Sequence, residues 1–394
     1  MKNKVKDLAI FSGKPVFNKI RSTSNLVQPS AEIFYTYAKK SFDVNHFTNN
    51  GPVLIQFERK LSEIYQSDYC LGFCSGFWAI ALCIKCLAIE GKNEIIMPSF
   101  TYRRMADIAA WLGMVPNFCE VSSKTLGMTA STVEQCINEN TALIMGIHPI
   151  VNLCDIDGLT QLSQDKKIPL MFDSVEAAYA SHHGKMIGSF GEAECFSMHA
   201  SKFINGFEGG YVTTNNPDLA HKLQRMRDFG ISESGEIVDL GMNAKLSDIH
   251  AAMALASFDD LEDQIIRNRN NYHIYYKSFE EIDGIDLVEY DEVEKRTFKN
   301  ILVRLNKRWP ISREATIKIM HAENMLVRPY YSPPLHKKNQ KYPTIYGELK
   351  LTEELSEQYL LLPCGDFTDQ DDVYDIVSLL RFIQNNGNEI EEAL

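Results

Sequence analysis

The sequence predicts an α/β protein in which a large domain, built on a mainly parallel, doubly wound sheet, is followed by a smaller C-terminal α+β domain. From about Ser75 to Asn215, short apolar runs alternate with amphipathic stretches, as they do where helices join parallel strands. This pattern changes near Asp259, and a chain of 394 residues exceeds the usual size of a single core. We therefore expect residues 1–258, including the N-terminal segment, to form the large domain and residues 259–394 the small one.

The strands of the large domain are predicted at apolar runs of the length that buried strands have. They are Glu94 to Met97, Ala142 to Ile147, Pro169 to Phe172, Glu194 to Ser197 and Tyr211 to Thr214. The amphipathic stretches Arg103 to Leu112 and Leu159 to Lys166 are long enough to be crossover helices. Because ligands of such sheets bind beyond the carboxyl ends of the strands, the functional site is expected there.

A long helix is predicted to start at Ser247, a good N-cap residue, and to bridge the two domains. Its apolar stripe comprises Ile249, Met253, Ala256, Leu261 and Ile265. The small domain is then expected to contain strands at Ile282 to Val288, Asn300 to Leu305 and Met325 to Val327, and a closing helix from Asp371 to Ile383.

Charge and hydropathy exclude several classes of function. The chain carries 40 basic and 52 acidic side chains and has no Lys/Arg-rich stretch, so we expect no nucleic-acid partner. Residues 1–7 are basic but lead into only a short apolar stretch, which does not resemble a signal peptide and favours the cytoplasm. The apolar segment Tyr69 to Ile89 is interrupted by Ser75, Gly76 and Lys85, which indicates a buried helix rather than a membrane span.

The nine cysteines are expected to be reduced thiols, because their number is odd and several lie in apolar runs. The run Cys83-Ile84-Lys85-Cys86 has the spacing of half a zinc site or of a redox pair. No second pair or Cys/His cluster follows at zinc spacing, so no metal site is predicted.

Lys202 and Asp173 are the candidate catalytic residues. Lys202 precedes the glycine-rich segment Phe207-Glu208-Gly209-Gly210, and Asp173 ends a predicted strand. Pyridoxal phosphate (PLP) needs an amine that forms a Schiff base and then carries protons, and a fixed carboxylate facing its ring nitrogen. Alone, Lys202 is better explained as a surface lysine and Asp173 as a helix cap. Together they favour PLP chemistry.

Two further segments suit the phosphate and the ring of such a cofactor. The amides of Gly76 and Phe77 stand at the predicted start of a helix, where they can point at a phosphate. Without other signs of PLP, a simple helix cap would be the better explanation. Tyr102 follows the first strong strand and is placed to stack on a pyridine ring. An ordinary half-buried tyrosine is the alternative.

With these motifs the chain resembles the DegT/StrS aminotransferases of fold type I, which act mostly on nucleotide-linked keto sugars and in some branches on keto cyclitols. The resemblance runs from Leu8 to Val16, through Asn50-Gly51-Pro52, to Leu362-Pro363, and its most specific segment is Phe196 to Gly210. It implies that PLP is the cofactor, that Lys202 is the Schiff-base lysine and that Asp173 pairs with the ring nitrogen. It further implies that Tyr102 stacks on the ring and that Ser197 holds the phosphate with the amides of Gly76 and Phe77.

The resemblance also implies a homodimer with shared active sites as the smallest active unit. In the segment from Gly241 to Ile249, Asn243 is the candidate for a contact with the cofactor phosphate of the neighbouring subunit. The stretch from Tyr330 to His336 resembles the family's segment near the sugar entrance, so Tyr331 and His336 are candidate substrate contacts. Packing of this loop on the small domain is an equal alternative.

Three departures from the family pattern concern the substrate and the tuning of the cofactor. Glu176 stands where the family commonly has Gln or His near the ring hydroxyl, and such a carboxylate must be protonated or neutralised. Phe77-Trp78 replaces a small or hydroxylated pair and adds bulk. His148-Pro149-Ile150-Val151 replaces a run of His, an aliphatic residue, an aromatic residue and Gly.

The expected function is therefore transfer of an amino group from an amino acid, with L-glutamate as the expected donor, to a keto sugar, for which a nucleotide-linked keto-deoxysugar is expected. A PLP-dependent sugar dehydratase and a keto-cyclitol aminotransferase are the alternatives. Related sugar dehydratases of the same fold carry histidine at the position that corresponds to Lys202. Because this chain has lysine there, the resemblance favours amino transfer. A non-catalytic sensor on the same fold would be expected to lack the lysine or its acid, so Lys202 and Asp173 argue against this function. The departure at Glu176 is the reason that it remains an alternative.

Overall fold

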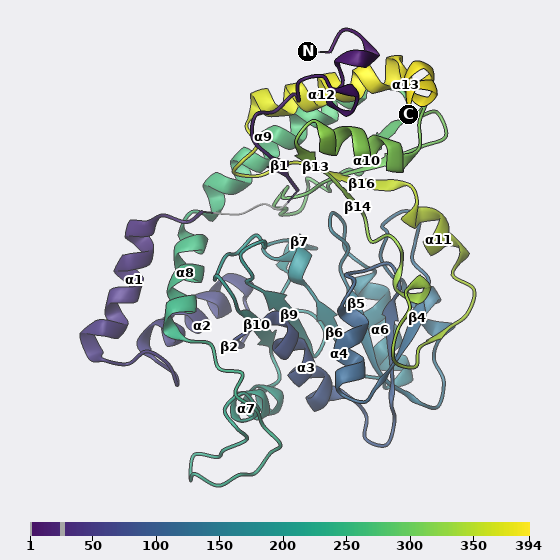
Figure 1. The fold of residues 1–394 in the computed structure, drawn as a ribbon. Coiled ribbons are helices and arrows are strands. Elements are labelled where there is room, and N and C mark those ends of the chain that lie inside the picture. Colours follow the sequence, from purple (N-terminus) through teal and green to yellow (C-terminus); the bar gives the residue numbers. More distant parts are fainter. Residues whose placement is uncertain (1, 24–27) are drawn as a thin grey trace.

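A computed structural model describes residues 2–23 and 28–394, and its centre is an eight-stranded sheet of order β15-β4-β3-β5-β6-β9-β10-β2 (Figure 1). The strands are β2 (Tyr69–Phe73), β3 (Glu94–Pro98), β4 (Val115–Cys119), β5 (Thr141–Ile147), β6 (Leu170–Asp173), β9 (Ala193–Ser197), β10 (Gly210–Thr214) and β15 (Ile345–Tyr346). All the strands predicted for this sheet are present. The strands β2, β4 and β15 were not predicted from the sequence.

The sheet is mainly parallel, as predicted, with β10 as the exception. Neighbours from β15 to β9 run parallel, whereas β10 runs antiparallel to both β9 and β2. Residues 198–209, which join β9 to β10, contain no helix that could carry the chain back for a parallel pairing. The chain therefore reverses there, and this reversal is the segment that carries Lys202.

Helices cover both faces of the sheet, because alternate residues of each strand point to opposite sides. In β3, Ile95 and Met97 belong to one apolar cluster and Ile96 to the other. The first cluster includes residues of α3 (Gly76–Leu87), α4 (Met105–Trp111) and α7 (Pro217–Met226). The second includes residues of α2 (Pro52–Tyr65), α5 (Ala130–Glu134), α6 (Ile156–Lys166) and α8 (Asp248–Asp259), and of α1 (Ala31–Val44). The doubly wound arrangement is thus confirmed.

The apolar segment from residue 69 to residue 89 forms β2 and the buried helix α3, as expected. Within residues 2–23 and 28–394, no helix combines the length and apolarity needed to cross a membrane. The nine cysteines all lie in this described part and are free thiols.

The single long helix predicted from Ser247 is wrong, because the structure has two helices there. The first is α8, and the second, α9 (Leu261–Phe279), begins after Asp260, whose φ of −94° and ψ of 4° leave the α-helical region. The Asp260 carboxylate accepts the backbone N–H of Ser30 at 2.9 Å, which ties the break to the start of α1. The predicted stripe fails at Ile249, which is exposed, since α8 is buried among α1, α2 and the sheet rather than along one face.

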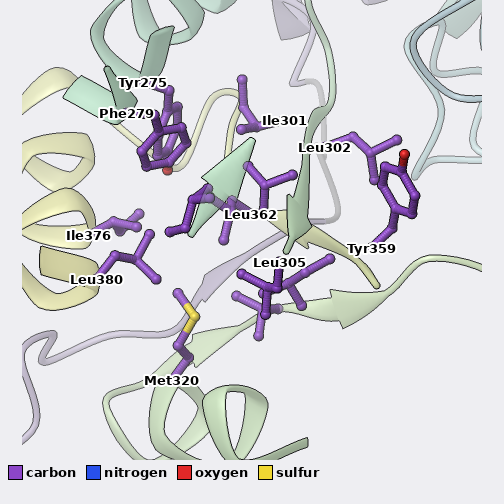
Figure 2. Packing of buried hydrophobic residues seen from close by; sticks show 14 of the residues in the cluster. Tyr275, Phe279, Ile301, Leu302, Leu305, Met320, Tyr359, Leu362, Ile376 and Leu380 are labelled. Carbon is purple, nitrogen blue, oxygen red and sulfur yellow. The ribbon is translucent and has the colours of Figure 1, made fainter. Parts of the chain in front are cut away.

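The smaller unit has its own antiparallel sheet and core (Figure 2). Its sheet contains β11 (Ile285–Leu287), β12 (Ile301–Leu305), β16 (Tyr359–Leu362) and β14 (Arg328–Pro329). Residues of α9, α10 (Arg313–Ala322), α12 (Gln370–Asn385) and α13 (Gly387–Ala393) share this core, while α11 (Lys350–Ser356) precedes β16. The closing helix and two of the predicted strands, β11 and β12, are present within a few residues of their predicted bounds, and the third predicted strand forms β13 (Met325–Leu326) outside this sheet. β14 and β16 were not predicted.

The N-terminal segment packs on the smaller unit, although the sequence analysis grouped it with the larger one. Val5, Leu8 and Phe17 are buried in the same core as β12 and α12. The short strand β1 (Arg21–Ser22) pairs in parallel with β13 (Met325–Leu326). The buried carboxylate of Glu323 accepts the N–H groups of Ala9 and Val16. We propose the domain boundary near Asp259, with this segment as part of the smaller unit.

Candidate active site

The candidate catalytic residues meet where two central strands end. Asp173 is the last residue of β6 and Ser197 is the last residue of β9, its neighbour in the sheet. Lys202 lies in the turn that follows β9, where its backbone N–H donates to the carbonyl of His199 at 2.7 Å. Parallel strands end at the same edge, so the topology brings these residues together, as expected from the sequence.

The amino end of α3 lies beside Ser197 and is the candidate anion cradle of the site. The Ser75 hydroxyl caps the helix by accepting the N–H of Trp78 at 3.3 Å. Gly76 and Phe77 are the first two residues of α3, so their N–H groups have no carbonyl acceptor within the helix. A Cβ on Gly76 would lie 2.8 Å from Ser197 Cβ, so only glycine allows this approach. Two free amides and a hydroxyl at a helix start fit a phosphate group.

Lys202 is paired with Glu176, which lies on a short 3₁₀ turn, Val175–Ala177, directly after β6. Lys202 Nζ is 2.6 Å from Glu176 Oε1, and both side chains are largely buried. Burial alone would lower the pKa of Lys202, but the adjacent Glu176 carboxylate raises it above its ordinary value. The amine is therefore held as an ammonium group before any cofactor has reacted with it.

Asp173 is a buried carboxyl group suited to a cationic partner. It is 6% exposed, and its Oδ1 accepts the N–H of Val175 at 3.1 Å. Burial raises its pKa to about 6, against the opposing effects of the Val175 N–H and the Lys202 ammonium. A protonated ring nitrogen placed against Asp173 would favour the carboxylate form, since an opposite charge offsets the cost of burial. The residues present thus fit PLP at both its phosphate and its ring nitrogen.

Sequence reasoning missed two residues that contact Glu176 from the smaller unit. Lys299 Nζ lies 3.6 Å from Glu176 Oε2, and Asn300 Nδ2 donates to the same oxygen at 3.4 Å. Burial raises the pKa of Glu176, but Lys202 and Lys299 outweigh it and hold that pKa below its ordinary value. Of the two options that the sequence left for Glu176, neutralisation by cations is the one found. The presence of Glu176 where Gln or His is common did indicate that a cation lies nearby. It did not indicate which residue supplies that cation.

Tyr102 and Tyr331 both lie near this charged group, the first exposed and the second partly buried. Tyr102 is 49% exposed, which leaves its ring accessible to a stacked partner. Burial raises the pKa of Tyr331 well above its ordinary value, with further contributions from Tyr330, Glu176, Asp173 and Tyr102. Tyr331 therefore lies within electrostatic range of both acids of the site.

His336 is buried and both of its ring nitrogens have partners. Nδ1 is 2.6 Å from the Ser99 hydroxyl, and Nε2 is 3.1 Å from Glu353 Oε1. Its backbone N–H also donates to the Ser99 hydroxyl at 3.1 Å. These contacts fasten the loop at residues 335–337 to the end of β3, so the loop packs on the large sheet and not on the small domain, as the alternative for this residue had it.

Asn243 is exposed on the segment between α7 and α8, in a backbone bridge with Asp228. The rest of its motif has a structural role, because Asp248 accepts the N–H groups of Val53 and Leu54 at the start of α2. A Cβ on Gly51 would lie 2.4 Å from an Asp248 oxygen, which explains the glycine before Pro52.

The two segments that depart from the family pattern, residues 77–78 and 148–151, lie in different places relative to the site. Phe77 packs on Trp78 with ring centroids 5.0 Å apart, and Trp78 contacts the exposed Trp111 of α4 at 6.0 Å. His148 is buried and stacks on Phe172, and burial lowers its pKa to about 3, so it is neutral. The aromatic pair thus lies beside the anion cradle, whereas His148 supports β6 from within.

A cluster of potential metal ligands lies outside this site. Asp157 Oδ2 is 3.1 Å from His182 Nε2 and 3.0 Å from His183 Nε2. Hydrogen bonds from the two imidazoles to one carboxylate oxygen account for these distances, and together they outweigh the effect of burial and lower the pKa of Asp157.

Comparisons with known proteins agree with this geometry. The sequence profile of the DegT/DnrJ/EryC1/StrS aminotransferase family matches residues 30–381. The dTDP-4-amino-4,6-dideoxy-D-glucose transaminase of Shigella dysenteriae is 26% identical over 90% of this chain and 97% of its own length. The crystal structure of DesI in the presence of its TDP-sugar product covers 99% of both chains with 27% identity and a TM-score of 0.93. An E. coli GDP-4-keto-6-deoxy-D-mannose-3-dehydratase with bound hydrated PLP, 19% identical over 93% of this chain and 100% of its own, shares the fold with a TM-score of 0.81.

Proposed function

The chain belongs to the DegT/DnrJ/EryC1/StrS aminotransferase family, whose members depend on PLP, and from this premise we propose that it moves the amino group of L-glutamate to a nucleotide-linked keto-deoxysugar. The observation that carries the proposal is the convergence of Lys202, Asp173 and the amino end of α3 at one sheet edge. A similar transaminase from Shigella dysenteriae and DesI, both named for sugar substrates or products, support the choice of acceptor.

Each residue has a distinct task in this proposal. The cradle of Gly76, Phe77 and Ser197 would hold the phosphate of PLP, and Asp173 would face its ring nitrogen. Bound PLP would supply an aldehyde that accepts the amino group and a ring that takes up negative charge. The Lys202 amine, once free, would remove a proton from the donor carbon and return one to the sugar carbon.

Mass spectrometry of complete reactions tests the acceptor. Purified protein, PLP and L-glutamate are incubated with dTDP- and GDP-linked keto-deoxysugars, and both the sugar and 2-oxoglutarate are measured. We expect an aminated sugar and an equal amount of 2-oxoglutarate with at least one acceptor. Loss of water from the sugar without amination would instead identify a dehydratase, and a lack of reaction with every acceptor would contradict the keto-sugar proposal.

Of the two candidate substrate contacts, Tyr331 is better placed than His336. Tyr331 lies within the electrostatic reach of Asp173 and Glu176. His336 uses both ring nitrogens on Ser99 and Glu353 and would act by holding its loop. We further place the protein in the cytoplasm, where reducing conditions suit nine free cysteines.

A homodimer is proposed as the active form, with Asn243 reaching the partner's phosphate site. The segment between α7 and α8 carries large apolar side chains in solvent, which is costly for a monomer. They are Phe229, Ile231, Ile237, Val238 and Leu240, with exposed fractions of 49, 40, 81, 54 and 80%. Burial of this surface against a second copy would also order Asn243 beside it.

Replacing Ile237 and Leu240 together with aspartate is expected to convert dimers to monomers in analytical ultracentrifugation and to remove at least about 90% of activity, because each buried carboxylate is costly. Val293→Asp is the matched control, since Val293 is also apolar and is 95% exposed on the smaller unit.

Mixing Lys202→Ala with Asn243→Ala chains should restore activity. In each mixed dimer, one site then has Lys202 from one chain and Asn243 from the other. A double variant that stays dimeric, or a mixture that stays inactive, would contradict the shared site.

A further inference from the structure

Glu176 is contacted by two lysines that come from different parts of the fold. Lys202 approaches one carboxylate oxygen from the β9–β10 segment, at 2.6 Å. Lys299 approaches the other oxygen at 3.6 Å from the segment leading into β12 of the smaller unit. Asn300 donates to that second oxygen at 3.4 Å, and its own backbone N–H and carbonyl both bond to the Tyr290 hydroxyl. Glu176 is thus fixed at both oxygens.

The burial of Lys299 indicates that its contact with Glu176 is its main one. Its side chain is 7% exposed, and isolated buried ammonium groups are strongly disfavoured. Within the described part of the chain, Glu176 is the only carboxylate whose oxygens lie within 4.0 Å of Lys299 Nζ. Lys299 and Lys202 therefore share one anion.

Such sharing has a direct effect on the Lys202 nitrogen. A single carboxylate at 2.6 Å favours the ammonium form, which cannot attack an aldehyde. A second cation on the same carboxylate weakens this preference for the ammonium form in two ways. It partly neutralises the negative charge of Glu176, and it repels the positive charge on Lys202. The other titratable groups that act on Lys202 are Asp173 and Tyr102.

We propose that Lys299 is a positioning residue that, through Glu176, eases removal of the proton from the Lys202 nitrogen. The inference rests on the proposed PLP chemistry, in which this nitrogen must lose a proton to react. Without Lys299, Glu176 would hold the Lys202 ammonium more tightly and uptake of PLP would need a higher pH. The pair also makes the reactivity of Lys202 depend on contact between the two units, since Lys299 belongs to the smaller one.

Competitive labelling of the PLP-free protein tests this directly. Lys202 is acetylated at a series of pH values and its labelled peptide is quantified by mass spectrometry, which yields the pKa of the amine. Lys299→Met is expected to raise that pKa by about 1 unit, a tenfold smaller free-amine fraction at a given pH. Lys299→Arg keeps the positive charge, so the pKa of Lys202 in this variant should stay within a few tenths of a unit of the wild-type value.

A double-mutant cycle with Glu176→Gln tests whether the effect passes through Glu176. In the Glu176→Gln background we expect Lys299→Met to shift the pKa of Lys202 by less than half as much as in the wild type. An unchanged or lowered pKa in Lys299→Met, or an equal shift in both backgrounds, would overturn the inference. Thermal unfolding of each variant checks that the fold is kept, and Lys299→Gln provides a second neutral variant.

Failure of the inference and failure of the proposed function are separable. Labelling uses protein without PLP, so it reports on Lys299 whatever the reaction is. If the wild type takes up PLP and transfers the amino group while Lys299→Met leaves the pKa of Lys202 unchanged, only the inference fails. If the wild type does not bind PLP, the proposed function fails, whatever the labelling shows.

Discussion

Replacing Lys202 with alanine is expected to abolish amino transfer, with kcat falling at least about 10⁴-fold, which corresponds to ~5 kcal/mol of lost transition-state stabilisation. The same nitrogen would bond to PLP and carry the proton, so both functions are lost together. Lys299 is a poor substitute, because its ammonium lies on the far oxygen of Glu176. Single-turnover reactions with L-glutamate and an acceptor sugar measure the loss.

Lys166→Ala is the matched control for this substitution. Lys166 is also paired with a glutamate, at 2.8 Å from Glu134, but it is 41% exposed on α6, away from the sheet edge that carries the site. Its variant should keep the wild-type rate within about twofold, since exposed ion pairs contribute little. A Lys202→Ala protein that transfers amino groups within tenfold of the wild-type rate would contradict the assigned role.

Asp173→Asn is expected to lower kcat by about 10²- to 10³-fold and to weaken PLP binding. Asparagine keeps the shape of the side chain but has no charge to keep a ring nitrogen protonated, so the ring would take up less negative charge in the reaction. Asp173→Glu keeps the negative charge but moves its position. Its kcat and PLP affinity should lie between those of the wild type and of Asp173→Asn. Stopped-flow kinetics and titration with PLP measure both effects. An Asp173→Asn variant with unchanged kcat would remove Asp173 from the mechanism.

The pH dependence of PLP binding gives an independent check on Asp173. Because burial raises the pKa of this carboxyl to about 6, the free protein loses the carboxylate as the pH falls through 6. PLP affinity of the wild type should therefore decrease between pH 7.5 and 5.5. The phosphate group also gains a proton in this range, and reaction of Lys202 depends on pH as well. Asp173→Asn corrects for both, because these two contributions should remain in that variant. Equal pH dependence in both proteins would contradict the assignment.

The parts of the site that have a signal in their own local sequence could be predicted. Lys202 lies beside a glycine-rich turn, Asp173 ends an apolar strand and Gly76 begins a helix. The regular alternation of strands and helices then indicated that all three lie at one sheet edge. The structure places them there.

What could not be predicted depends on contacts between distant segments. Lys299 has no local motif, and its role follows only from its 3.6 Å approach to Glu176 across the two units. The direction of β10 is set by the short return from β9, although its apolar run reads like those of the parallel strands. The break at Asp260 lies within a continuous apolar pattern and depends on a contact with Ser30. His336 was ambiguous because its partner Ser99 comes from another segment.

The packing of the N-terminal segment on the smaller unit has a consequence for the order in which the chain assembles. Val5, Leu8 and Phe17 are synthesised well before their apolar partners in β12 and α12. Most of the central sheet can form while synthesis continues, whereas the smaller core must wait for α12. Since Lys299 belongs to that late core, a nascent chain can carry Lys202, Asp173 and the phosphate cradle without the second cation on Glu176. In such a chain Glu176 would hold the proton of Lys202 more tightly than it does after the smaller unit has packed.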